Sequence, residues 1–142
     1  MTPTLPEILR GEAIALSTPM PPEAGGDYMA SRIGMLATLA ALAAQEAERG
    51  TAARVWENAA IRALFAAAGV YDTQMGGALA KAASEVDTDY TWSALDTANA
   101  ALRRLLIALH EAVEAAADTA TDRKIIDLYV QMAHARRLEM GG

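Results

Sequence analysis

One helical ridge in residues 90–117 limits what this chain can fold into more than any other feature of its sequence. Residues that face one side recur there at alternating steps of four and three, the spacing of a buried helix seam. The series is Leu95, Asn99, Leu102, Leu106, Leu109, Val113 and Ala116. The alternation with a period of two that marks strands is missing from the chain. The ridge therefore predicts an all-α protein.

Capping residues and glycine or proline breaks predict where the helices begin and end. The predicted helices cover 4–16, 27–49, 51–68, 73–85, 90–117 and 119–138. Gly50 stands where a left-handed residue commonly ends a helix, so 27–49 and 51–68 are expected to turn back on each other. The predicted fold is a single-domain bundle of five to six helices over 1–142, with two long antiparallel helical hairpins. Residues 1–26, a helix and a Pro/Gly-rich loop, are expected to pack on this bundle.

Composition excludes several functions. The net charge is −6, which argues against a nucleic-acid partner and against an anionic membrane surface. The chain has no cysteine, so disulfides and thiolate metal sites are excluded. The most apolar stretch, 34–44, is shorter than the ~20 residues that span a bilayer, and the N-terminus does not resemble a secretory signal. We expect a cytoplasmic protein without a cofactor, and the abundance of alanine and arginine favours a bacterial gene of high GC content.

His110 and Glu114 are separated by four residues, the spacing that places two metal ligands on one helix face. A metal or acid/base site needs further groups, and the candidates are Asp127 and His134 on the following helix. In an antiparallel hairpin Asp127 stands nearer the level of His110, whereas His134 is offset by ~9 Å. The interpretation that we favour is a boundary histidine packed against the core. Motifs of zinc hydrolases and of nucleophilic catalysis are missing.

Aromatic residues flank the glycine pair at 76–77. Tyr71, Met75 and Trp92 could line a pocket for an apolar small ligand beside this loosened segment. The alternative is that they close one end of the core with their polar atoms outward. Asn99, the polar member of the ridge, is expected to bond a backbone carbonyl or water.

The segment 27–49 carries more apolar surface than one neighbouring helix would cover. Its two adjoining stripes are Met29, Ile33, Leu36, Ala40 and Ala43, and Met35, Leu39 and Leu42. An uncovered patch of this kind marks an interface, and a symmetric homodimer is the commonest arrangement.

The leading hypothesis is therefore a soluble, non-enzymatic helical protein. It would act through the helix faces of 27–49 and 90–117, as a homodimer or an accessory subunit. One alternative is a small metal-binding or acid/base enzyme centred on His110 and Glu114. The other is a bundle that binds an apolar small ligand.

Overall fold

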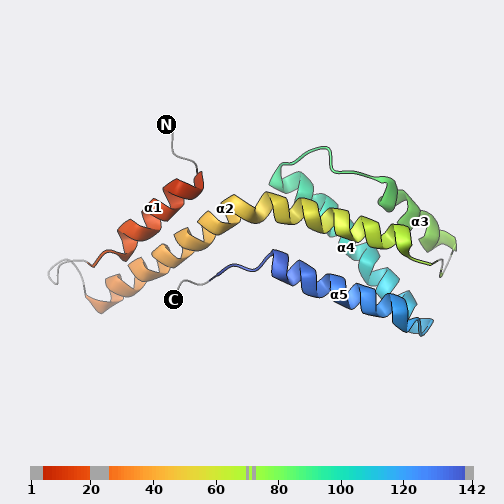
Figure 1. The fold of residues 1–142 in the computed structure, drawn as a ribbon. Coiled ribbons are helices and arrows are strands. Elements are labelled where there is room, and N and C mark those ends of the chain that lie inside the picture. Colours follow the sequence, from red (N-terminus) through yellow and green to blue (C-terminus); the bar gives the residue numbers. More distant parts are fainter. Residues whose placement is uncertain (1–4, 20–25, 70, 72, 140–142) are drawn as a thin grey trace. The chain divides into compact units, whose positions relative to one another are not determined.

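The computed structural model describes residues 5–19, 26–69, 71 and 73–139, and this part of the chain forms five α-helices without any strand (Figure 1). They are α1 (Leu5–Ser17), α2 (Asp27–Ala67), α3 (Thr73–Ser84), α4 (Trp92–Ala115) and α5 (Thr119–Ala135). The prediction of an all-α fold is confirmed. Among the described helices, none combines the length and the apolar character needed to cross a bilayer.

The predicted helix end at Gly50 is wrong, because α2 continues through it to Ala67. No described glycine has a positive φ, so Gly50 does not adopt the left-handed conformation of a helix terminator. The segments on both sides of Gly50 are rich in strong helix formers such as Ala47, Glu48 and Ala52, and a glycine inside a helix costs only ~1 kcal/mol relative to alanine. The predicted hairpin between 27–49 and 51–68 is therefore absent, and one 41-residue helix replaces two.

The chain divides into two compact units. Unit 1 comprises Met1–Gly50 and Leu138–Gly142, and unit 2 comprises Thr51–Arg137. Helix α2 contributes its first part to unit 1 and its second part to unit 2. The sequence predicts one domain, whereas the contacts between residues divide the chain into these two units.

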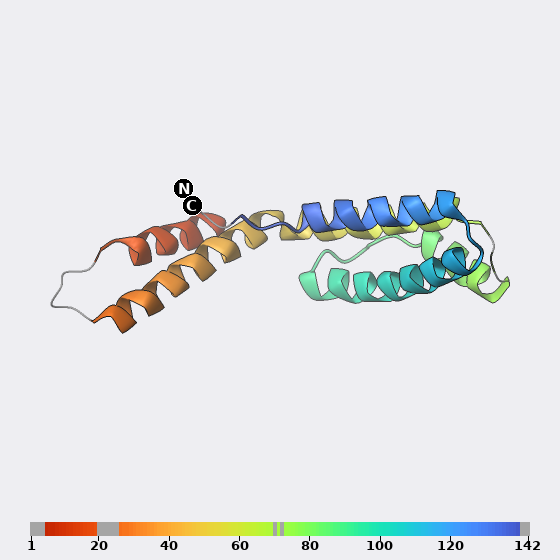
Figure 2. The same cartoon turned by 90° about the horizontal axis from the view of Figure 1, so that it is seen from below.

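Unit 2 is built around the predicted ridge of α4. The side chains of the ridge are buried from Leu95 to Val113, while Ala116 caps the helix and is exposed. Helices α2, α3 and α5 supply the remaining core residues. These are Ile61, Phe65, Leu79, Ala82, Ile125, Leu128 and Met132. Helices α4 and α5 run in opposite directions, as predicted for a hairpin (Figure 2).

The turn between α4 and α5 has the hydrogen bonds of a Schellman motif. The amide of Asp118 donates to the carbonyl of Val113 over 3.1 Å, and the amide of Ala117 donates to that of Glu114 over 3.0 Å. Ala117 occupies the left-handed position with φ 53°. Glycine usually stands there, because a Cβ atom makes the left-handed region unfavourable.

Ala117→Gly is expected to stabilise the protein by about 0.5–1 kcal/mol, because it removes this Cβ penalty. The matched control is Ala116→Gly, since Ala116 is right-handed with φ −83°. The control should destabilise by about the same amount, because glycine there only adds freedom to the unfolded chain. Urea denaturation measures both free energies of unfolding. A loss of stability in Ala117→Gly would contradict the argument.

Candidate functional site

Helix α1 of unit 1 has no buried residue along its 13 residues. Such a short helix is marginal in water unless its apolar face packs against a neighbour. Within the described part of unit 1, it is linked to the first part of α2 by the ion pair between Arg10 and Glu48. The side chain of Gln45 also exchanges two hydrogen bonds of 2.8 Å with the backbone of Glu139. Polar contacts of this kind contribute little at a surface.

Seven large apolar side chains of unit 1 are between 45% and 71% exposed. They are Leu5, Ile8 and Ile14 of α1 and Met29, Met35, Leu36 and Leu39 of α2. On α2 the buried residues Ala37 and Ala44 face one side. At 100° per residue, Met35 and Leu39 lie on the opposite side, whereas Met29 and Leu36 lie on a flank between the two. We call Met29, Met35, Leu36 and Leu39 the outer stripe. From Ile33 to Gln45 no residue of α2 is charged, so charge does not interrupt the apolar surface there.

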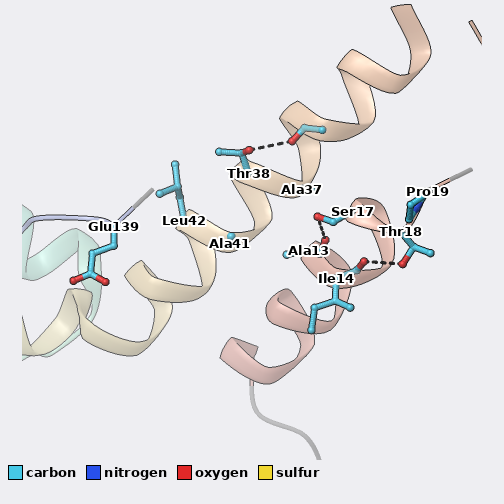
Figure 3. A pocket seen from close by; sticks show the side chains of 11 residues that line it. Ala13, Ile14, Ser17, Thr18, Pro19, Ala37, Thr38, Ala41, Leu42 and Glu139 are labelled. Carbon is cyan, nitrogen blue, oxygen red and sulfur yellow. Dashed lines mark hydrogen bonds between the residues drawn. The ribbon is translucent and has the colours of Figure 1, made fainter. Parts of the chain in front are cut away.

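A hollow of about 620 Å³ separates α1 from α2 within unit 1. Figure 3 shows side chains from both helices around it. The α2 side is lined mainly by small residues, which are Gly34, Ala37, Thr38 and Ala41. Unit 1 therefore presents both protruding large side chains and a recess of small ones.

The predicted pair His110 and Glu114 lies at the α4–α5 turn of unit 2, and α5 adds Asp122 to it. Nε2 of His110 is 2.9 Å from Oδ1 of Asp122 and 3.9 Å from Oε1 of Glu114. The His110 side chain is 19% exposed, and its ring packs against Tyr129 with 5.7 Å between ring centroids. The expected boundary position is thus observed, together with a third potential ligand.

The other two predicted partners of His110 do not join this group. The potential ligand atoms that lie within 4.8 Å of one another belong to His110, Glu114 and Asp122. Asp127 and His134 are exposed farther along α5. Asp127 was expected opposite His110 on the assumption that the hairpin turns at residue 119. The tight turn instead brings the first turn of α5, with Asp122, beside His110.

A fully buried carboxylate on α2 is a feature that the sequence did not predict. Glu57 on α2 is fully buried, and it accepts hydrogen bonds from two arginines. Nε and Nη2 of Arg103 are 2.9 and 2.8 Å from Oε1, and Nε of Arg136 is 2.5 Å from Oε2. A buried carboxylate needs such partners, because desolvating an unpaired charge is costly.

Two buried asparagines extend this network. Asn99 donates to Oδ1 of Asn58 over 2.9 Å, so its partner is a side chain and not the expected carbonyl or water. Asn58 donates to Oδ2 of Asp87, and Arg62 donates to Oδ1 of Asp87. Burial alone would raise the pKa of Asp87, but the hydrogen bonds from Arg62 and Asn58 outweigh it and lower the pKa below 3.8.

A sequence signal for the network exists. The buried positions of α2 in unit 2 recur at steps of three and four, and several of them are polar. They are Arg54, Glu57, Asn58, Ile61, Arg62 and Phe65. Charged residues on a core-facing stripe indicate a paired interior network.

The three proposed pocket residues Tyr71, Met75 and Trp92 do not come together. Tyr71 and Met75 pack against the core of unit 2. The hydroxyl of Tyr71 donates to Asp118 over 2.6 Å, just beyond the end of α4. Trp92 is the first residue of α4, about 36 Å away along the helix axis, where it bonds Thr51 and stacks on Arg54. These residues therefore do not line one ligand pocket.

Comparisons of the chain with models of protein families, with curated proteins and with solved structures found no match. Its function is therefore argued from its own residues.

Arg103→Ala and Arg136→Ala are each expected to destabilise the protein by about 1–2 kcal/mol, because the other arginine still neutralises Glu57. The double variant should cost more than the two single losses together, about 3–5 kcal/mol, since it leaves a buried charge unpaired. A double-mutant cycle by urea denaturation measures the difference. Arg104→Ala, at an exposed position, is the control and should change little. Strictly additive losses would contradict the shared role.

Tyr71→Phe is expected to raise the pKa of Asp118. The hydrogen bond from Tyr71 is the largest cause, ahead of those from Thr121, that lowers this pKa from 3.8 to about 2. A carboxyl with a lowered folded pKa stabilises the fold above about pH 4 and loses that contribution as the pH falls through about 2. The stability difference between wild type and Tyr71→Phe should shrink over this window.

NMR titration of the Asp118 carboxyl checks this pKa, with Tyr90→Phe as the control at an exposed tyrosine. An unchanged titration of Asp118 in Tyr71→Phe would show that the hydrogen bond is not its cause.

Proposed function

We propose that this protein is a helical interaction protein that self-associates as a homodimer through unit 1. The observation that carries the proposal is the exposure of the outer stripe beside a helix, α1, that has no buried residue. Large apolar groups in water on a two-helix unit are unfavourable, and covering them would stabilise both helices.

The area of this surface fits a stable interface. A half-exposed side chain of this size presents on the order of 100 Å², so seven present roughly 700 Å². Each partner of a standard protein interface buries about 800 Å². The summed exposed apolar area of unit 1 is therefore close to the area that one partner of a specific interface buries.

The chemistry of the surface favours a second copy of the chain as the partner. A twofold interface places the same patch on both subunits, so the patch must be self-complementary. Unit 1 carries protruding Met and Leu side chains on one helix and a hollow of small residues beside it. Two outer stripes can pack against each other, since no charged residue interrupts α2 from Ile33 to Gln45.

Helix α4 is not part of the proposed interface, although its sequence suggested that it would be. The leucine ridge of α4, which was expected to share in the dimer, is buried within unit 2. The face of α4 that remains outward carries Ile107 as an isolated large apolar residue between exposed Arg103, Arg104 and Glu111. Unit 1 is therefore the proposed interface.

Leu36→Glu combined with Leu39→Glu is expected to convert a dimer into a monomer, because it places charges in the centre of the outer stripe. Size-exclusion chromatography with light scattering should give about twice the chain mass of 14.9 kDa for wild type and 14.9 kDa for the variant.

The matched control is Ile107→Glu, since Ile107 is 54% exposed against 56% for Leu39. It adds one glutamate to unit 2, against two in the test variant, and should leave the dimer intact. A wild-type mass of 14.9 kDa at micromolar concentration, or dissociation of the control, would refute self-association through unit 1.

A further inference from the structure

We infer that His110, Glu114 and Asp122 form a binding site for a divalent transition-metal ion, with the chemistry of zinc. This site lies in unit 2 and does not depend on the self-association proposed for unit 1. It joins an imidazole nitrogen and two carboxylate oxygens from two helices, a ligand set suited to zinc and to similar metals.

The distances are those of a nearly assembled coordination shell. Metal–ligand distances of 2.0–2.2 Å place the ligand atoms of a tetrahedron about 3.4 Å apart. The two distances from Nε2 of His110, 2.9 Å to Asp122 and 3.9 Å to Glu114, lie on either side of this value. All three ligand atoms lie within 4.8 Å of one another. Glu114 is 66% exposed, so a change of its rotamer can close the remaining gap.

The two less mobile ligands are held in place by the surrounding structure. The ring of His110 is packed against Tyr129. Asp122 belongs to the first turn of α5, and its amide donates to the carbonyl of Asp118 over 3.0 Å. Because the backbone is already ordered, metal binding would order little more than the Glu114 side chain.

Access to the group is provided by a hollow of about 230 Å³ at the α4–α5 turn. Its lining includes Glu114 and Asp122, so an ion that enters meets both carboxylates. Asp118 also lines the hollow, but its oxygens already accept hydrogen bonds from Tyr71 and Thr121. Three protein ligands leave a fourth position of a tetrahedral ion open to water.

A simple ion pair between His110 and Asp122 is the competing explanation of the short contact. Such a pair needs no third group, whereas a metal site also requires Glu114. The contribution of Glu114 to zinc binding therefore separates the two explanations.

Isothermal titration of the full chain with zinc chloride is the test. Wild type is expected to bind one zinc ion per chain. His110→Ala and Asp122→Asn should each weaken zinc binding by at least about tenfold, because even supporting residues of metal sites contribute that much. Glu114→Gln should also weaken it, and this exposed substitution carries no risk to folding. Zinc should raise the melting temperature of wild type more than that of Glu114→Gln.

His134→Ala is the matched control, since it removes the other histidine of the chain from an exposed position on α5. It should bind zinc as wild type does. Absence of saturable zinc binding by wild type would overturn the inference. Equal zinc affinity of wild type and Glu114→Gln would overturn it as well, because Glu114 would then not be a ligand. Neither result would bear on the mass of the dimer.

Discussion

Burial of the α4 ridge is the constraint on which unit 2 depends. Leu95, Leu102, Leu106, Leu109 and Val113 can leave water together only if other helices cover the whole length of α4. The second part of α2, together with α3 and α5, supplies that cover. Once the ridge faces inward, the 3.6-residue period places His110 at its edge. The short turn to α5 then sets which acidic residue lies beside that histidine.

The ridge is not apolar along its whole length, and its polar part specifies how the helices meet. Asn99 of α4 donates a hydrogen bond to Asn58 of α2. The neighbouring Glu57 accepts hydrogen bonds from Arg103 of α4 and from Arg136, which follows α5. A shifted helix would leave these groups buried without partners, which costs far more than a shift among leucines. The polar network thus favours one alignment of α2, α4 and α5, while the apolar contacts supply most of the driving force.

The two units differ in how far they bury their large apolar side chains. Unit 2 buries most of its leucines within the chain and leaves a few large apolar side chains exposed, among them Ile107, Ile126 and Val130. Among its described residues, unit 1 leaves most of its large apolar side chains exposed, and α1 has no buried residue. The proposed functions follow this contrast. Association is assigned to the unit that is incomplete by itself, and metal binding is assigned to the unit whose rigid core can hold ligands in place.

The sequence by itself determined the all-α class, the buried seam of α4, the α4–α5 hairpin and the boundary position of His110, because helical periodicity and capping are local properties. It also pointed to the excess of apolar surface on residues 27–49. Only the tertiary structure decided that α2 runs on through Gly50, since a glycine ends a helix only where the chain gains contacts by turning back. It alone brought Asp122 to His110 and two arginines to Glu57, because such meetings depend on the alignment of helices distant in sequence. That alignment is set by packing across the core. The spacing of residues within one helix does not determine how that helix aligns with another.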